Sequence, residues 1–455
     1  ACGGSTPRWL GRCPQCGEWN TLVESTQASP SAGKNRYSAM AALAPSSAVA
    51  VLGEIEAAEV ARTPTGQEEL DRVLGGGIVA GAVVLIGGDP GIGKSTLLLQ
   101  ALDSLQRSGQ PTLYVTGEES GAQVALRSQR LGLAHSQVQV LAETQLDTIL
   151  ATVDSIQPAV LVMDSIQTVF TEQLTSAPGS VAQVRECAAA LARIAKRQDT
   201  ALLLVGHVTK EGMLAGPKVL EHLVDAVLTF EGDRFASHRL LRAVKNRFGA
   251  THELGVFEMR GQGLAEVLNP SELFLGGDEP SAGTATIVAC EGTRPLVVEL
   301  QALVSTTSYA SPRRTATGIG TNRLHQILAV LEKHLGLPLS RFDCYLAVAG
   351  GLEVEEPAAD LGVAAAVVAS YRDLTLPPGT VLVGELGLGG QLRPVGQLEL
   401  RLQEAARLGF TRAVVPKGSG LSKVAAGLGL QLLEAGSVAE ALVAALGVNP
   451  ADDRA

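Results

Sequence analysis

The sequence predicts an α/β fold, and three observations support this prediction. Between residues 63 and 275, short apolar runs alternate with helical patterns. The runs are almost continuously apolar, which is typical of parallel strands that helices cover on both faces. A second α/β pattern fills residues 276–455, after the hinge-like break Gly276-Gly277-Asp278-Glu279-Pro280.

The elements of the first α/β region follow from these apolar runs. We expect a short entry strand at 60–62, a helix at 95–105, and buried strands at 82–86, 113–116, 138–141, 159–163 and 201–205. Three closely spaced strands then follow, at 226–230, 238–244 and 254–259. Their short connections predict an antiparallel edge on an otherwise parallel sheet.

Composition places the chain among globular proteins with a large core. At about 100–200 residues per domain, the 455 residues suggest two or three domains. Hydrophobic residues make up 46% and charged residues 18%, which excludes a disordered chain. The net charge of −10 argues against a protein that coats DNA passively. Any DNA binding therefore needs a local basic patch or a ring of subunits.

The sequence also predicts where the protein works. No apolar run is long enough to span a membrane, and no signal-peptide pattern opens the sequence. The six cysteines lack the density of a disulfide framework, so we expect a reducing, cytoplasmic compartment. The first residue is Ala1 rather than Met, and we expect that the start of the chain is missing.

Four segments are expected. Residues 1–24 form a Cys/Trp/Gly-rich module, and residues 25–62 form a linker rich in Ser, Ala and Pro. Residues 63–275 form the first α/β domain and residues 276–455 form the second.

A phosphate-binding loop lies between the predicted strand 82–86 and the helix that follows it. Gly88-Asp89-Pro90-Gly91-Ile92-Gly93-Lys94-Ser95 fits the pattern G-x-x-x-x-G-K-[ST] in full, and Thr96 continues it. The glycines let backbone N–H groups surround phosphate oxygens, and the helix N-terminus adds a positive dipole end. We expect this loop to bind ATP, with Lys94 at the β- and γ-phosphates and Ser95 as a Mg²⁺ ligand. A chance glycine turn is the alternative.

Carboxylates follow two other predicted strands. Asp164 ends the run 159–163 and suits a Walker B residue, which holds the Mg²⁺ water shell; a strand-end turn cap is the alternative. Glu118 and Glu119 follow the strand 113–116, where an acid can polarise the attacking water. Glu118 is the first candidate and Glu119 the second, although both could instead cap a helix N-terminus.

Polar residues also follow the strand 201–205. His207 and Lys210 stand where a side chain can sense the γ-phosphate and relay its loss to a loop, and Gln167 is a weaker candidate. A hydrogen-bonded loop histidine is the alternative for His207.

A basic motif, Lys245-Asn246-Arg247-Phe248-Gly249, follows the strand 238–244. Two cations at this spacing on a strand end point the same way. They could reach a phosphate that another subunit holds, which is the role of an arginine finger and requires an oligomer. A solvated basic turn is the alternative.

The N-terminal cysteines have metal-ligand spacing. Cys13-Pro14-Gln15-Cys16-Gly17 is half of a zinc knuckle, and Cys2 is a third thiol. A structural Zn²⁺ takes four ligands. We expect Cys2, Cys13 and Cys16 to bind Zn²⁺ in the intact protein, with the fourth cysteine lost before Ala1. A redox C-x-x-C would open a helix in a thioredoxin-like unit, and no such pattern is present.

With these motifs in place, the chain closely resembles the bacterial RadA (Sms) family of DNA repair proteins over essentially its whole length. The resemblance rests on the cysteine module with Trp9 and Trp19, the P-loop, the stretches 114–120 and 206–212, and the motif 245–249. It implies a RecA-like P-loop ATPase core behind an N-terminal zinc-ribbon remnant. It also implies a homo-oligomeric ring, a hexamer, that drives branch migration on single-stranded and branched DNA beside the RecA recombinase.

The core is also similar to the replicative helicase DnaB, whose corresponding Lys-x-Arg acts across the subunit interface. This similarity implies catalytic roles for Lys245 and Arg247 at a neighbouring subunit's nucleotide. In the RadA family the same motif is tied to DNA-dependent function, so a DNA contact is a second interpretation.

The C-terminal domain is similar to the proteolytic domain of Lon. Lon peptidases use a Ser–Lys dyad, but here Ala358 stands at the serine position, and Glu399 and Arg401 stand where Lon has lysines. Without a hydroxyl or a neutralisable amine the dyad cannot operate. We expect a Lon-protease-like scaffold that builds the ring and binds DNA. Candidate DNA contacts are Arg313, Arg314, Arg323 and Lys333, for which a solvated face is an equal alternative.

Three functions compete. The first is a DNA-dependent motor ATPase with DNA-contacting loops at 172–179 and 209–218. The second is a signalling or binding ATPase like the circadian clock ATPases, which the motif 245–249 and the cysteine module disfavour. The third is an ATP-dependent peptidase, which Ala358 disfavours.

Overall fold

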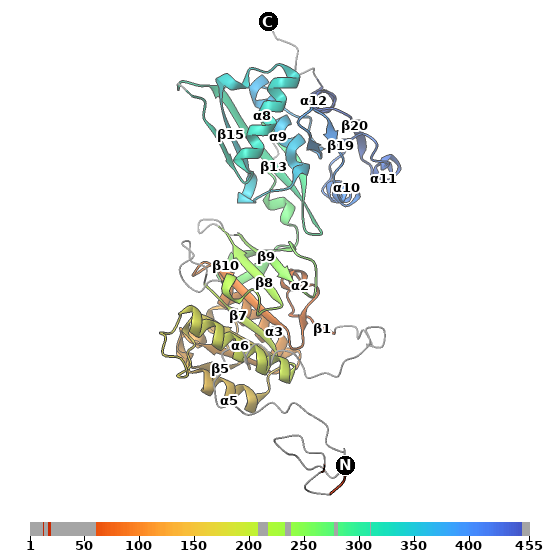
Figure 1. Ribbon diagram of the computed structural model, residues 1–455. Helices are drawn as coiled ribbons and strands as arrows, with labels where there is room; N and C mark the ends of the chain where they lie inside the picture. Colours follow the sequence, from red (N-terminus) through yellow and green to blue (C-terminus); the bar gives the residue numbers. More distant parts are fainter. Residues whose placement is uncertain are drawn as a thin grey trace. The chain divides into compact units, whose positions relative to one another are not determined.

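The computed structural model describes residues 12, 17–19, 61–207, 217–232, 238–276, 281–309 and 311–447, with the backbone alone for 217 and 218. The chain divides into two units, Ala1–Val51 and Leu52–Ala455. The larger unit contains two large sheets (Figure 1). The predicted α/β class is confirmed. The predicted division at residues 24, 62 and 275 stays a prediction.

The first large sheet, its helices and a separate pair of short strands, β1 and β2, span residues 62–266. Their bounds are β1 (Arg62–Thr63), α2 (Glu68–Leu74), β2 (Ile78–Val79), β3 (Val83–Gly88), α3 (Lys94–Arg107), β4 (Thr112–Thr116), α4 (Gly121–Arg130), β5 (Gln139–Ala142), α5 (Leu146–Ile156), β6 (Val160–Asp164), α6 (Val181–Gln198), β7 (Ala201–Val205), α7 (Pro217–Leu220), β8 (Ala226–Glu231), β9 (His238–Asn246), β10 (Leu254–Arg260) and β11 (Gly263–Glu266). Every strand expected between 82 and 259 is present within one or two residues of its predicted bounds.

Within the described residues this sheet has nine strands, in the order β11-β10-β9-β8-β3-β7-β6-β4-β5. The six strands from β8 to β5 are mutually parallel, so the strand at 226–230, which the sequence assigns to the antiparallel edge, is parallel to β3. The antiparallel edge consists of β9 and β10, as the sequence predicts, together with β11. The short strand β11, at 263–266, was not predicted.

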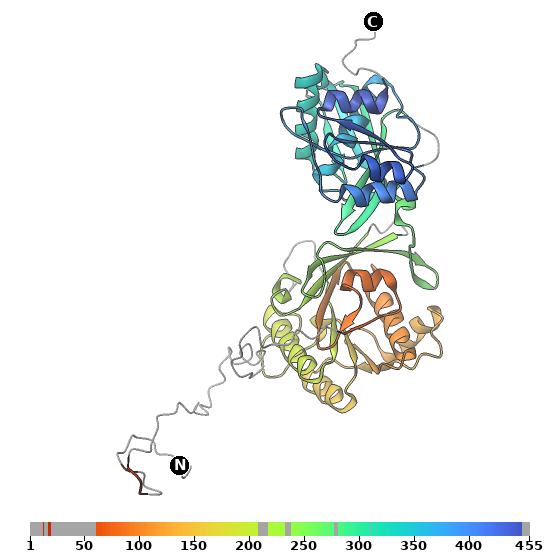
Figure 2. The same ribbon diagram turned by 90° about the vertical axis from the view of Figure 1, so that its right-hand side faces the viewer.

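Alternate residues of the parallel strands face two different layers of helices. Val84 and Ile86 of β3 pack with α2 and α3, whereas Val83 and Leu85 pack with α5 and α6. Figure 2 shows helices on both faces of this sheet. Because both faces are covered, every residue of β3 is buried, which explains its unbroken apolar sequence.

The second large sheet, its helices and a separate pair of short strands, β17 and β18, span residues 284–446. Their bounds are β12 (Thr284–Glu291), β13 (Arg294–Thr306), β14 (Arg314–Thr317), α8 (Thr321–Leu335), β15 (Phe342–Val348), α9 (Asp360–Arg372), β16 (Thr380–Leu382), β17 (Glu385–Leu386), β18 (Leu392–Arg393), α10 (Leu398–Arg407), β19 (Arg412–Pro416), α11 (Ser422–Gly427), β20 (Gln431–Ala435) and α12 (Val438–Leu446). The strand order β14-β15-β13-β12-β16-β19-β20 mixes parallel and antiparallel pairs. The buried helix α9 contacts both β12 and β13.

No helix in the described ranges combines the length and apolarity that a membrane crossing requires.

Candidate nucleotide site

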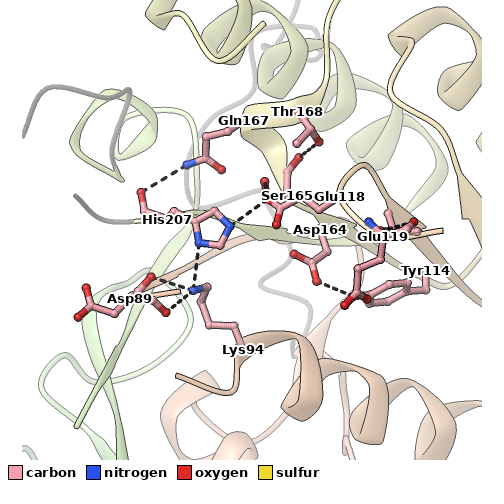
Figure 3. Close-up of polar contacts among 12 residues, drawn as sticks. Asp89, Lys94, Tyr114, Glu118, Glu119, Asp164, Ser165, Gln167, Thr168 and His207 are labelled. Atoms are coloured by element: carbon pink, nitrogen blue, oxygen red, sulfur yellow. Dashed lines mark hydrogen bonds and ion pairs between the residues drawn. The ribbon is translucent and has the colours of Figure 1, made fainter. Parts of the chain in front are cut away.

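The candidate site lies where the parallel strands end. β3, β4, β6 and β7 run in the same direction, so the residues that follow them gather at one edge of the sheet. The P-loop follows β3, Glu118 follows β4, Asp164 ends β6, and His207 follows β7. Figure 3 shows these side chains converging on the same space.

The P-loop has the backbone that its glycines permit. Gly88, Gly91 and Gly93 have φ values of 150°, 78° and 120°, in the region that L side chains rarely adopt. A Cβ at Gly88 would lie 2.9 Å from Phe230 Cβ, and one at Gly93 would lie 3.0 Å from Met259 Cε. Glycine is therefore needed at both positions, for conformation and for space.

The helix that follows the loop leaves its first turn open to an anion. Helix α3 begins at Lys94, and its N-cap residue Gly93 provides no side-chain hydrogen bond. Its first turn contains no acidic residue. By contrast, Ser120 and Gln123 form a capping box at the start of α4. The uncapped N–H groups and the dipole of α3 fit a phosphate group.

Lys94 is held inside the loop that precedes it. Its Nζ donates hydrogen bonds to the carbonyl oxygens of Gly88 (2.8 Å) and Asp89 (2.9 Å). Burial lowers the pKa of Lys94, and the carboxylates of Asp164, Glu118 and Asp89 oppose that shift. The ammonium group thus lies in a field of negative charge at the site where phosphate is expected.

Asp164 is buried at the end of β6 and receives a hydrogen bond from a tyrosine. The hydroxyl of Tyr114 lies 2.5 Å from Asp164 Oδ2. Burial, together with the nearby charge of Asp164, raises the pKa of Tyr114, so the phenol stays protonated. Asp164 and the Ser95 hydroxyl are hard oxygen donors, which is the chemistry that Mg²⁺ prefers.

Glu118 is the carboxylate with partners on both sides. Its Oε1 accepts a hydrogen bond from the Ser165 hydroxyl (2.5 Å) and lies 3.0 Å from His207 Nε2. The hydrogen bond to His207 is the main cause that lowers the pKa of Glu118 to about 2. Its side chain is 42% exposed, so the ionised carboxylate is accessible to water.

His207 connects Glu118 to Lys94. Its Nδ1 lies 3.4 Å from Lys94 Nζ, and its Nε2 faces Glu118. Because the ammonium group can only donate, Nδ1 must accept, and the ring proton of a neutral imidazole lies on Nε2. Gln167 Nε2 donates to the backbone oxygen of His207 at 3.4 Å. Lys210 lies outside the described residues.

The adjacent glutamates point to different partners. Glu119 Oε2 forms an ion pair with Arg127 at 2.5 Å, while Glu118 faces Ser165 and His207. Sequence reasoning did not select Ser165, Tyr114 or Arg127. A signal existed for Ser165, which directly follows Asp164, but none for the other two.

Lys245 and Arg247 of the basic motif bond to residues outside the candidate nucleotide site. Lys245 Nζ donates to the backbone oxygens of Glu221 (2.6 Å) and Val224 (2.7 Å), and burial lowers the pKa of Lys245. Arg247 Nη1 lies 3.1 Å from Asp225 Oδ1, although the Arg247 side chain is 57% exposed. Within the described part of the chain, neither cation bonds to the P-loop of its own subunit.

Strand register places this motif at the opposite ends of the strands from the P-loop. Ala226 of β8 is opposite Val84 at the start of β3, and Asn246 of β9 is opposite Ala226. The P-loop follows Gly88 at the other end of β3. Six residues at about 3.3 Å each separate the two edges by roughly 15–20 Å.

A close backbone contact shapes the end of the motif. Asn246 Nδ2 donates to the backbone oxygen of Val73 at 3.1 Å. A Cβ at Gly249 would lie 2.7 Å from Gly75 Cα. Only glycine fits there, which gives the last residue of the motif a structural reason.

The C-terminal region holds charged groups of another kind. Ala358 is 3% exposed and belongs to an apolar cluster with Val288 and Val383. Arg401 forms two hydrogen bonds with the Glu356 carboxylate, at 2.7 and 2.6 Å.

One of the expected DNA contacts is engaged inside the protein. Arg323 forms an ion pair with the buried carboxylate of Asp360, which also accepts from the Leu386 backbone N–H at 2.9 Å. This pairing favours a structural role for Arg323. Arg313 stacks on Tyr309, with Cζ 3.7 Å from the ring centroid.

The cysteines of the N-terminal module lie outside the described residues. Residues 12 and 17–19 of this module are described, and Arg12 pairs with Trp19 in an antiparallel bridge. Arg12 Nε also donates to the backbone oxygen of Gly17 at 2.7 Å.

The sheet, the P-loop and the carboxylates at its edge define a P-loop ATPase with a RecA-like core. Residues 51–213 match the model of the AAA domain, and residues 1–24 match that of the rubredoxin metal binding domain.

The chain is 56% identical to the DNA repair protein RadA of Synechocystis sp., over 99% of this chain and 94% of that protein. It is 53% identical to RadA of Pseudomonas aeruginosa, over 94% of each chain. It is 49% identical to RadA of Bacillus subtilis, over 98% of this chain and 97% of that protein. The chain therefore belongs to the RadA family of DNA repair proteins.

Proposed function

We propose that the protein is a DNA-dependent ATPase of recombinational repair. In this proposal it forms a ring, a hexamer, that drives branch migration on single-stranded and branched DNA beside a RecA recombinase, in the cytoplasm. The observation that carries the proposal is the separation of two phosphate-binding elements. The P-loop lies at one edge of the parallel sheet, and Lys245 and Arg247 lie at the other.

Within one subunit, the site supplies the parts that ATP hydrolysis needs. Gly88, Asp89, Pro90, Gly91, Ile92, Gly93, Lys94, Ser95 and Thr96 would bind the phosphates, and Ser95 and Asp164 would hold Mg²⁺. When bound, Mg²⁺ neutralises charge on the β- and γ-phosphate oxygens. Glu118 orients and polarises the attacking water. A carboxylate with a pKa of about 2 is ionised at neutral pH, so it is ready to accept a hydrogen bond from that water.

His207 supports the relay role. Its imidazole lies between Lys94 and Glu118 and contacts both. A γ-phosphate that draws Lys94 toward itself would change one of the two contacts of this ring. Because His207 lies two residues before Thr209, the start of the loop 209–218, the change can pass from the nucleotide to a loop expected at DNA.

A second subunit would complete the site. Arg247 is more than half exposed, and the roughly 15–20 Å between sheet edges prevents it from reaching its own nucleotide. In a closed ring, the edge of one subunit faces the site of the next. Lys245 and Arg247 would then stabilise the transition-state charge across the interface, as arginine fingers do.

The candidate DNA contacts differ in charge and in their bonds within the protein. The loop 172–179 contains no Lys or Arg, and Gln183 Nε2 bonds its backbone oxygens at Leu174 (3.3 Å) and Ser176 (3.0 Å). The loop 209–218 lies outside the description of side chains. Because the loop 172–179 has no cation and Arg323 is paired with Asp360, we place the DNA contacts in the loop 209–218 and at Arg313, Arg314 and Lys333.

Zn²⁺ belongs to the same proposal, with Cys2, Cys13 and Cys16 as ligands. The match of residues 1–24 to a metal binding domain supports it. Metal analysis of the purified protein tests it, and a zinc content near zero would contradict it.

Mixing two inactive variants tests the composite site. Lys94→Ala removes the P-loop lysine but keeps Arg247, and Arg247→Ala does the reverse. If the site forms between subunits, a mixture regains ATP hydrolysis, since about a quarter of the interfaces in a random ring combine both intact groups. Arg260→Ala is the matched control, because Arg260 is 63% exposed on the same sheet and should leave hydrolysis unchanged.

The mixture would stay as inactive as its components if Arg247 acted within its own subunit. Loss of ATP binding by Arg247→Ala alone would likewise place Arg247 in the site of its own chain.

DNA dependence is tested by ATP hydrolysis with and without single-stranded DNA, beside the Lys94→Ala variant. We expect strong stimulation that Lys94→Ala abolishes and that weakens steeply with salt. Hydrolysis that ignores DNA would favour the alternative, a signalling or binding ATPase without translocation.

A further inference from the structure

The hydroxyl of Tyr114 is buried between two charged groups. Tyr114 lies in β4 and has no exposed surface. Its oxygen is 2.5 Å from Asp164 Oδ2 and 3.2 Å from Arg127 Nη2. Figure 3 shows Tyr114 and Glu119 on the far side of Asp164 from Lys94.

The direction of these hydrogen bonds follows from the donors available. A guanidinium group has N–H donors and no acceptor, so the Tyr114 oxygen must accept from Arg127. The hydroxyl has a single proton, and the remaining neighbour is the Asp164 carboxylate, which accepts it. Arg127 thus determines which way the hydroxyl points.

Arg127 is itself fixed in place. It projects from α4, its side chain is 12% exposed, and its Nη2 lies 2.5 Å from Glu119 Oε2. Glu119 is in turn held by its backbone, because its N–H donates to Thr116 Oγ1 at 3.0 Å. The order of contacts is therefore Glu119, Arg127, Tyr114, Asp164, with each group oriented by the one before it.

We propose that Glu119, Arg127 and Tyr114 are positioning residues that orient the Asp164 carboxylate for Mg²⁺ and nucleotide. The inference rests on the proposed function, in which Asp164 holds the metal's water shell. With Tyr114 bonded to Oδ2, the role toward that shell falls to Oδ1. Hydrogen bonds of this kind fix the orientation of a carboxylate at a metal site, and their loss typically costs about 10- to 100-fold in metal affinity.

This assignment also separates the paired glutamates by role. Glu118 contacts Ser165 and His207, while Glu119 forms an ion pair with Arg127 and would act through it. Glu119 is therefore a positioning residue and not a second candidate for the base.

The test is the affinity for the metal, measured apart from turnover. Tyr114→Phe keeps the ring and removes the hydroxyl. In the full-length protein with ADP, Mn²⁺ binding followed by electron paramagnetic resonance should weaken about 10-fold. The half-saturating Mg²⁺ concentration for ATP hydrolysis should rise by a similar factor, and ADP binding without metal should not change. Tyr371→Phe is the matched control, since Tyr371 packs on Phe342 in the C-terminal region.

A double variant tests the order of the contacts. Arg127→Gln should weaken Mn²⁺ binding less than Tyr114→Phe, because the hydroxyl remains but loses its fixed direction. Tyr114→Phe with Arg127→Gln should bind Mn²⁺ no more weakly than Tyr114→Phe alone, since Arg127 acts through the hydroxyl. Additive losses would overturn the relay, and unchanged Mn²⁺ binding in Tyr114→Phe would overturn the role of Tyr114.

The wild-type protein distinguishes this inference from the proposed function. A wild-type protein that neither binds Mn²⁺ with ADP nor hydrolyses ATP would refute the proposed function, and the relay with it. A wild-type protein that does both, beside a Tyr114→Phe variant with the same metal dependence, would refute the relay alone.

Discussion

The candidate nucleotide site and the Arg401–Glu356 pair of the C-terminal region both contain charged groups, but these groups differ in exposure and in hydrogen bonding. At the nucleotide site, Glu118 is 42% exposed and His207 is 27% exposed, so both can exchange their partners for substrate and water. In the C-terminal region, Arg401 is 3% exposed and bonded to both oxygens of Glu356, and also to the backbone oxygen of Val288 at 2.6 Å.

The difference distinguishes accessible groups, which can take part in a reaction, from a buried pair that stabilises the fold. A buried ion pair with all its hydrogen bonds made has no capacity left for chemistry. Removing one partner leaves an uncompensated charge, and the cost is stability. An accessible pair of groups with remaining hydrogen-bond capacity contributes little to stability and much to reactivity. Substitutions in the two regions should therefore affect different measurements.

The largest effect is expected from Lys94→Ala. Loss of the ammonium group removes the charge that would face the β- and γ-phosphates in the proposed site. ATP hydrolysis should fall by about 100- to 1,000-fold, while the C-terminal region is unaffected. Steady-state hydrolysis measures the first quantity, and a urea unfolding curve measures the second. Hydrolysis within a few-fold of wild type would remove the P-loop from the proposed site.

Arg401→Ala should show the reverse pattern. It leaves the Glu356 carboxylate without its guanidinium partner, and because that side chain is 23% exposed we expect the loss in the free energy of unfolding to lie at or below the about 3–5 kcal/mol of a fully buried pair. ADP affinity should stay unchanged. Arg393→Ala is the control, because its ion pair with Glu385 is more exposed and 3.5 Å long, and it should cost at most about 1 kcal/mol. Equal losses in the two variants would contradict the comparison.

His207→Ala should slow hydrolysis without destabilising the protein. The imidazole orients Glu118, and misplacing a reacting group typically costs about 100-fold in rate. ATP binding should change little, and His207→Asn should recover part of the rate, because its side chain can still donate a hydrogen bond to Glu118. An unchanged kcat in His207→Ala would show that Glu118 does not depend on this contact.

Ala358→Ser tests whether the C-terminal region can regain peptidase chemistry. The new hydroxyl enters an apolar cluster, which should cost about 1–3 kcal/mol of stability. Casein should remain intact, because Arg401 cannot act as the neutral base that a serine nucleophile needs. Casein cleavage by Ala358→Ser, but not by wild type, would show that the dyad site is still operational.

The smallest effect is expected from pH. The pKa of Glu118 is lowered from 4.5 to about 2, so its contacts stabilise the folded state above pH 4.5. That contribution is lost as the pH falls from 4.5 toward 2. Without nucleotide, Glu118→Gln should therefore lose less stability over this window than wild type, by urea unfolding at each pH. Because Glu118 is partly exposed, the difference should be small.

Local sequence was sufficient for one half of the site. The P-loop, Glu118, Asp164 and His207 each follow a recognisable apolar run, and parallel strands bring their carboxyl ends to one edge. The chain order of these residues therefore predicted their neighbourhood. The antiparallel strands β9 and β10 were also predicted, because closely spaced strands with short connections pair in this way, whereas β11 was not predicted and β8 is parallel to β3.

The contacts of Tyr114 and Arg127 depend on which strands and helices are neighbours in the fold. Tyr114 is opposite Val162 in the β4–β6 pair, so Asp164 is its diagonal neighbour, two residues further along. Nothing in the sequence around Tyr114 shows that β6, and not another strand, lies beside it. Arg127 comes from α4, and the place of a side chain on a neighbouring helix is equally invisible in the sequence.

The sequence by itself determined the chemistry of this protein, because glycine positions, apolar runs and the residues that end them are local properties. Only the tertiary structure decided the partners: that Glu118 and Glu119 point apart, that Arg323 is paired with Asp360, and that Lys245 and Arg247 lie across the sheet from the P-loop. Each of these depends on which strands and helices pack side by side, and the packing of distant segments is settled by the whole core at once.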